Sequence, residues 1–290
     1  MDTSTEMAID LREVVLSNSS FGPVEIDRIS DFIAEDSTRY ATLRDAVNEL
    51  ASHDEQTPAS SVRLVVCYFM LGKWDEAEST LANADGGALA YYYLGKTKFE
   101  LRKYDEAVAC YESAKTAGYD SDHCALAIAE ALRYMNDTKG AMDTLDQMFG
   151  PIEQTAEYLY QRGATVSAIG GNPSEVVALY ERAVEVDGRH AGALFGLALE
   201  NDRHGNDAQA LSLYRRAADC FPTHVGALLN LGILHEDVQE YDKAQHCYQR
   251  ILDCYPDHQR ARLYFKDTAA SRDMFYDEEE TKRQDRLAQI

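Results

Sequence analysis

The sequence repeats itself with a period of 34 residues, and the clearest copy runs from Val225 to His258. In its first half Leu228 and Leu231 follow each other at the spacing of one helix face, and Tyr248 and Ile251 do the same in its second half. A short polar stretch separates the halves, so the copy is expected to be two helices joined by a turn. A pair of this size cannot bury its own apolar faces, and it therefore predicts neighbours of the same kind.

Six consecutive repeats fit this register. They begin at Pro58, Ala88, Asp122, Glu157, Ala191 and Val225. The eighth position holds a small or medium residue, which lets the two helices of a repeat cross closely; these residues are Val65, Gly95, Ala129, Ala164, Ala198 and Gly232. The twenty-fourth position holds a large side chain: Leu81, Tyr111, Leu145, Tyr180, Tyr214 and Tyr248. Pro222 and Pro256 stand at the thirty-second position, where proline ends the second helix.

This pattern resembles the tetratricopeptide repeat family, in which the eighth position is small, the twentieth alanine, the twenty-fourth aromatic and the thirty-second proline. The resemblance covers residues 58–258, about two thirds of the chain. It implies an all-α fold, a right-handed α-solenoid of about six helix–turn–helix repeats with helical caps. The first repeat is four residues short, the third has Leu145 and Met148 in place of an aromatic residue and alanine, and the fourth has Gly188 in place of proline.

Segments on either side of residues 58–258 are expected to close the array. Residues 1–57 read as a helical N-terminal cap, for which a degenerate repeat is one interpretation; one helix starts at Gly22-Pro23 and another near Asp36, while residues 10–16 fit a helix and a strand equally. Residues 259–270 continue the first-helix pattern, and a capping helix over the open apolar edge is expected to span residues 259–276. Residues 277–290 predict a charged, helix-prone tail or linker.

The charge of the chain limits its partners. It has 50 acidic and 28 basic residues, a formal net charge of −22. This charge repels phosphates, so we expect no direct nucleic-acid binding by this segment and no association with anionic membranes. No apolar stretch reaches the roughly 18 residues of a membrane span, and the N-terminus lacks the apolar core of a signal peptide. The sequence favours a cytoplasmic protein that is a monomer or weak homodimer and binds a protein or peptide.

Residue types that carry chemistry are present, but their spacing does not build a site. His190, His224 and His258 recur every 34 residues, which places successive rings roughly 9 Å apart if the repeats stack, whereas zinc holds its nitrogen ligands at about 2 Å. The six cysteines form no CxxC pair and are interpreted as small core residues. Nucleophile-elbow, phosphate-loop and HExxH motifs do not occur. The sequence predicts no metal, no cofactor and no enzyme activity.

A binding groove is what the family resemblance adds. In tetratricopeptide arrays the first helices line a concave face, and positions 2, 5, 9, 12 and 13 commonly meet the ligand. Carried over, these positions imply a peptide-binding groove made of Leu89, Tyr92, Lys96, Phe99, Glu130, Arg133, Tyr158, Gln161, Arg162 and Thr165. Phe195, Asp202 and Glu236 hold matching positions in the last two repeats. Aromatic anchors among a few charges suit a peptide ligand, although some of these side chains could instead pack against neighbouring helices.

Two functions follow from the sequence. The first is a non-catalytic protein–protein interaction scaffold that binds a peptide or protein segment in the concave groove. The alternative comes from the tail FYDEEETKRQDRLAQI. It looks like that of planctomycete-type tetratricopeptide proteins in which a segment similar to the C-terminal domain of the RNA polymerase α subunit follows. Such a segment would lie beyond Ile290, and the chain would be the interaction module of a larger transcription-associated protein.

Overall fold

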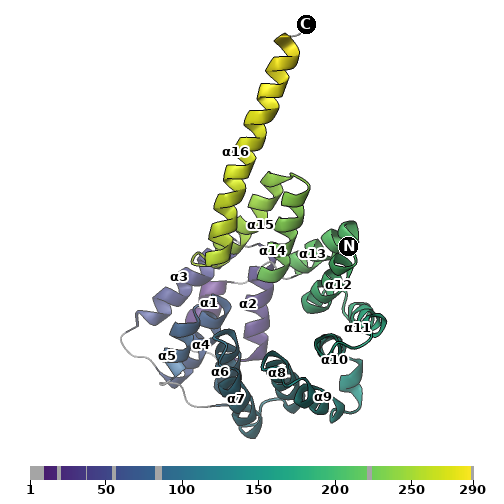
Figure 1. Ribbon diagram of the computed structural model, residues 1–290. Coiled ribbons are helices and arrows are strands. Elements are labelled where there is room, and N and C mark those ends of the chain that lie inside the picture. Colours follow the sequence, from purple (N-terminus) through teal and green to yellow (C-terminus); the bar gives the residue numbers. More distant parts are fainter. Residues whose placement is uncertain are drawn as a thin grey trace, which may run out of the picture. The chain divides into compact units, whose positions relative to one another are not determined.

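The computed structural model describes residues 10–17, 21–36, 38–53, 57–81, 87–220 and 224–288, and all regular secondary structure in these ranges is helical (Figure 1). The fold is thus the all-α solenoid that the repeats predict. The chain divides into two compact units, Met1–Ala193 and Leu194–Ile290. Pro222, expected to end a second helix, lies outside the described residues, as do residues 1–9 of the N-terminal cap and residues 289–290 of the tail.

The first unit begins with three helices and continues with four helix pairs. The three helices are α1 (Leu11–Leu16), α2 (Pro23–Glu35) and α3 (Arg39–Ala51). The pairs are α4 (Pro58–Met70) with α5 (Trp74–Thr80), α6 (Ala88–Glu100) with α7 (Tyr104–Thr116), α8 (Ser121–Tyr134) with α9 (Thr138–Asp146), and α10 (Ala156–Ile169) with α11 (Pro173–Val186). A 3₁₀ helix, η2 (Pro151–Gln154), precedes α10. Helices α6, α8 and α10 also pack on the second helix of the repeat before them, as a solenoid requires.

The second unit follows from α12 (Ala191–Arg203), which starts at the end of the first. It contains α13 (Asp207–Cys220), α14 (Val225–Asp237), α15 (Tyr241–Cys254) and α16 (Gln259–Ala288). Helix α16 packs on α15 and buries Ala261 and Thr268. It runs without a break through residue 277, where the sequence suggested a change from capping helix to tail.

Local sequence explains where the helices begin and end. Thr57 caps α4 in a reciprocal pair of hydrogen bonds with Ser60, and Pro58 occupies the first helical position. Gly170 ends α10 with a φ of 77°, a left-handed conformation that glycine adopts at little cost. None of the six cysteines, all of which lie in the described ranges, forms a disulfide; Cys67, Cys124, Cys247 and Cys254 are buried, as core residues should be.

The close-approach position confirms the register in two repeats and corrects it in a third. A Cβ added at Gly95 would lie 2.5 Å from the Tyr111 ring, and one at Gly232 would overlap Tyr248. In the fourth repeat the equivalent contact is made by Gly163, whose added Cβ would lie 2.9 Å from the ring of Tyr180. The expectation that Ala164 holds this position is therefore wrong. The repeat carries one extra residue between Gly163 and its second helix.

Candidate functional site

The ten residues that the sequence suggested for a groove lie on three first helices of the first unit. Helix α6 carries Leu89, Tyr92, Lys96 and Phe99, α8 carries Glu130 and Arg133, and α10 carries Tyr158, Gln161, Arg162 and Thr165. Those on α6 and α8 are half-buried, and so is Arg162. The other three residues on α10 are buried, with 5%, 2% and 0% of Tyr158, Gln161 and Thr165 exposed.

On α6, Tyr92 and Lys96 lie among aromatic rings. Tyr92 stacks on Tyr119 with ring centroids 4.2 Å apart and planes 13° from parallel. The Lys96 Nζ lies 4.8 Å from the ring centroid of Phe69 and 5.5 Å from that of Tyr93, within the range of cation–π attraction. Burial lowers the pKa of Lys96, and this effect is opposed by the charges of Glu130, Glu100 and Glu157. Carboxylates from three successive first helices therefore act on one ammonium group.

On α8, Glu130 and Arg133 form an ion pair 3.5 Å long. Burial is the main cause that raises the pKa of Glu130 to about 6, with Arg133 opposing the rise. The Arg133 guanidinium also lies 4.9 Å from the centroid of the Tyr134 ring and donates from Nη2 to Gln161 Oε1 at 3.4 Å. Its Nε is buried without a hydrogen-bond partner in the described part of the chain.

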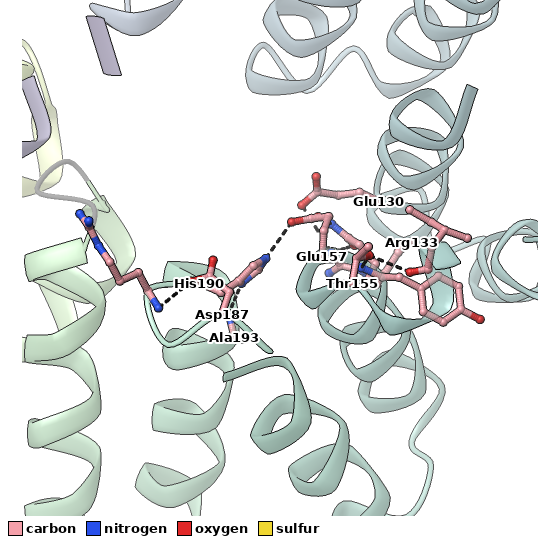
Figure 2. Close-up of polar contacts among 11 residues, drawn as sticks. Glu130, Arg133, Thr155, Glu157, Asp187, His190 and Ala193 are labelled. Carbon is pink, nitrogen blue, oxygen red and sulfur yellow. Dashed lines mark hydrogen bonds and ion pairs between the residues drawn. The ribbon is translucent and has the colours of Figure 1, made fainter. Parts of the chain in front are cut away.

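From Gln161 the polar contacts continue along α10 (Figure 2). Gln161 Nε2 donates to Glu157 Oε1 at 2.9 Å, and the other Glu157 oxygen lies 2.9 Å from His190 Nε2. Burial opposes the ionisation of Glu157, but the hydrogen bonds from His190 and Gln161 outweigh it and lower its pKa. Because His190 Nδ1 accepts the backbone N–H of Ala193 at 3.0 Å, the proton between His190 and Glu157 is on Nε2.

The remaining α10 residues point elsewhere. Arg162 donates to Asp146 Oδ1 of α9 at 2.7 Å and to the Tyr158 hydroxyl at 3.1 Å, and the Thr165 hydroxyl donates to the Gln161 carbonyl at 2.8 Å. The extra residue in the fourth repeat explains this placement. Counting from Glu157 shifts the α10 positions by one, and one residue turns the side chain by about 100° around the helix.

With the positions of α10 counted from Ala156, Glu157 and Tyr160 become the second and fifth residues of the fourth repeat, which are positions that commonly meet a ligand. A Cβ added at Gly192 would lie 3.0 Å from the Tyr160 ring, just as one added at Gly226 would lie 3.1 Å from the ring of Phe195 in the second unit. Tyr160 is thus the fifth-position residue of its repeat, and its ring centroid lies 5.3 Å from that of His190. The sequence did contain a signal: glycine follows Tyr160 after three residues, as it follows Tyr92.

In the second unit, two of the carboxylates on first helices already have partners. Asp202 accepts a hydrogen bond from the Tyr214 hydroxyl at 3.1 Å, and Glu236 accepts one from the Tyr248 hydroxyl at 3.0 Å. The hydroxyl of Thr268 on α16 also donates to Glu236. Both tyrosines hold the twenty-fourth position, so these contacts join the two helices of a repeat.

No three His, Cys, Asp or Glu side chains of the described ranges lie close enough to share a metal ion. No helix among the residues described is long and apolar enough to cross a bilayer.

Models of one protein family match parts of this sequence. Models of the tetratricopeptide repeat match residues 89–116, 170–225 and 226–258. Among solved structures, a chain of the APC/C hetero-tetramer Cut9–Hcn1 superimposes with a TM-score of 0.56 at 11% identity, covering 86% of this chain and 49% of that one. Yeast Tom70 superimposes with a TM-score of 0.55 at 13% identity, covering 87% of this chain and 54% of that one. The tetratricopeptide protein TTC0263 of Thermus thermophilus superimposes with a TM-score of 0.53 at 15% identity, covering 63% of this chain and 100% of that one.

This chain spans about half the length of the Cut9–Hcn1 chain and of Tom70. At such identities the structural similarity establishes the fold alone. No curated protein matches the sequence significantly.

Proposed function

Because the chain is a tetratricopeptide-repeat protein, we propose that it is a non-catalytic scaffold that binds a peptide or a segment of another protein along the first helices of its first unit. Proteins of this family generally act as interaction scaffolds. The observation that carries the assignment to this face is the polar line Arg133–Gln161–Glu157–His190, which crosses from α8 over α10 to the start of α12. Side chains fixed by one another in this way are pre-organised for a ligand.

The chemistry of this face suits a peptide. Arg133 and Lys96 offer donors to carbonyls and carboxylates, while Glu130 and Glu157 offer acceptors to backbone N–H groups and basic side chains. Tyr92, Tyr134 and Tyr160 add aromatic surface, the kind of group that dominates affinity at protein interfaces. In the fourth repeat the proposed contacts are therefore Glu157 and Tyr160, in place of Tyr158, Arg162 and Thr165.

Paired substitutions test the assignment. We expect the double variant Arg133→Ala/Glu157→Ala to lose partners that wild type captures in quantitative affinity purification, and to bind an isolated partner at least about tenfold more weakly in calorimetry. The matched control is Lys115→Ala/Lys139→Ala, which changes two exposed residues on second helices. Circular dichroism checks that both variants fold.

A third variant separates the two registers of α10. Arg162→Ala removes a residue that we place against α9, so it should bind the partner as wild type does. Equal binding by wild type and the Arg133/Glu157 variant would refute the proposed face, and a selective loss in Arg162→Ala would restore the register counted from the sequence.

A further inference from the structure

The ninth residue of a first helix belongs to the concave face, yet its exposure differs between repeats. Val66 of α4 is fully buried, whereas Ile233, at the same position in α14, is 37% exposed. Both are β-branched aliphatic side chains, so their own chemistry does not explain the difference. In the first repeat, part of the protein must cover the position that a ligand would otherwise meet.

Helix α2 contributes to that cover. Ile26 of α2 is 6% exposed and belongs to one buried cluster with Val65, Val66 and Tyr93. Residues packed against this cluster include Phe21, Leu89 and Tyr92, two of which the sequence placed in the groove. In Figure 1, α5 lies on one side of α4 and α2 lies on the other. Helix α2 is therefore on the side of the array that the first helices line, and not on the side of the second helices.

Charges surround this apolar contact in a complementary arrangement. The ring of Phe21 lies 5.1 Å from the guanidinium of Arg63, on which the charge of Glu25 acts. Asp27, the neighbour of Ile26, contributes to the raised pKa values of Tyr93 and Tyr119, although burial is the larger cause for both. Lys96 lies over Phe69 and Tyr93 at the edge of the cluster. The covered surface therefore carries cations, and the helix that covers it carries carboxylates.

We propose, building on the function proposed above, that α2 is an internal occupant of the groove of the first two repeats. The partner at this end of the groove is then an amphipathic helix that presents an aliphatic side chain beside a carboxylate, as Ile26 and Asp27 do, and displaces α2. A helix satisfies the hydrogen bonds of its own backbone, so it can bind to an apolar surface that offers few polar groups. The polar line from Arg133 to His190 lies further along the array, on α8 and α10.

Competition is the consequence of this arrangement. A tethered occupant has a high effective concentration, and a ligand in solution binds only the fraction of molecules whose groove is open. Substitutions that loosen α2 should therefore tighten the binding of a second copy of the same helix.

A labelled peptide of residues 21–36, FGPVEIDRISDFIAED, is the probe. Its binding to the full chain is measured by fluorescence anisotropy in wild type, Ile26→Asp and Val24→Asp. Val24 lies on the same helix but is 59% exposed, so its variant is the matched control. We expect Ile26→Asp to bind the peptide at least about tenfold more tightly than wild type and the control, because its own α2 no longer fills the groove. A peptide that itself carries Ile26→Asp should not bind.

A second variant covers the case in which Ile26→Asp perturbs the N-terminal helices. Asp27 is exposed, so Asp27→Arg should fold normally, and it should also admit the peptide and speed hydrogen exchange in α2. Equal affinity in all variants, or binding of the Ile26→Asp peptide, would overturn the proposal. The result is separable from the function proposed above: peptide capture with full partner retention in Arg133→Ala/Glu157→Ala would uphold α2 as an occupant and refute the site on α8 and α10.

Discussion

Glycine and tyrosine act as a matched pair in the repeats where the helices cross most closely. Gly95 faces Tyr111 and Gly232 faces Tyr248, with no room for a methyl group between them. Both tyrosines are buried, so their rings cannot move into solvent without loss of packing. The two residues are sixteen positions apart in both repeats, but the repeat alone did not pair them, because a period shows which positions recur and not which side chains touch.

We expect Gly95→Ala to destabilise the protein by about 1–3 kcal/mol through overpacking, even though alanine favours helix. Gly188→Ala is the control, since an added Cβ there meets only the Val184 carbonyl oxygen, at 3.8 Å. That change should be neutral or slightly stabilising. Urea denaturation of both variants measures the difference, and equal stabilities would contradict the pairing.

Histidine caps three successive first helices. The Nδ1 atoms of His190, His224 and His258 accept the backbone N–H groups of Ala193, Ala227 and Ala261 at 3.0, 3.1 and 3.1 Å. A ring nitrogen that accepts a hydrogen bond carries no proton. Burial also lowers the pKa of His224 to about 4. The recurrence of histidine every 34 residues is thus explained by helix capping.

The cap makes stability depend on pH in a defined direction. His224 binds a proton more weakly in the folded chain than in the unfolded one, so its contribution is complete above about pH 6.5 and is lost as the pH falls toward 4. Asparagine caps helices without titrating. Between pH 7 and pH 4, the free energy of unfolding of His224→Asn should therefore fall by about 1–3 kcal/mol less than that of wild type.

Denaturant unfolding at the two pH values gives this difference directly. His246→Asn, a change at an exposed histidine of α15, is the control and should follow wild type. A pH response of His224→Asn that matches wild type would show that the cap does not control acid sensitivity.

At the scale of the helices, the sequence predicted well which helices form pairs, and less well which side chains lie on each face of a helix. Turn residues and apolar spacing placed the helices because these signals are local. The repeat positions in α10 were assigned one residue too late, because the 34-residue period does not show at which point of a repeat an extra residue is inserted. The packing of α2 against α4 and α6 was not predicted either, since Ile26, Ile29 and Ile33 mark an apolar stripe without showing what it covers.

Helix α16 shows how far a cap has to extend. Arg272 donates to Gln245 Oε1 at 2.7 Å, the Tyr276 hydroxyl donates to Asp242 Oδ2 at 3.1 Å, and Phe275 packs on Tyr241 with ring centroids 5.7 Å apart. These contacts with α15 lie beyond the point where the apolar pattern of the sequence fades.

A chain that ends at Ala270 should therefore lose about 1–3 kcal/mol of unfolding free energy, because it lacks these contacts. A chain that ends at Asp277 keeps them and should stay within about 0.5 kcal/mol of full length. Guanidinium unfolding of the two shortened chains is the measurement. Equal losses in both would mean that the later part of α16 carries the stability.

Over the whole molecule, the excess of acidic residues sets a repulsion that the ion pairs do not balance. The formal charge is −22, and most of the ion pairs in the described residues are at least partly exposed, where each contributes little. Folding brings the excess charges closer together than they are in the extended chain.

Salt should consequently stabilise this protein. Raising sodium chloride from about 20 mM to about 300 mM shortens the screening length from about 20 Å to about 6 Å, and we expect the Tm to rise by roughly 2–5 °C. Thermal melts followed by circular dichroism at both concentrations test this. A Tm that falls with salt would mean that the ion pairs outweigh the net repulsion.

The extra residue of the fourth repeat has a consequence for protein engineering. Repeat arrays invite the transplantation of ligand-contacting residues from one repeat into another by matching position numbers. In α10 such a transplant would put Lys96 or Glu130 equivalents at Thr165, whose side chain is fully buried. A charge placed there would have no water or partner and would unfold the repeat. A recognition surface grafted onto this chain therefore has to be aligned on Gly163, the point where the two helices touch.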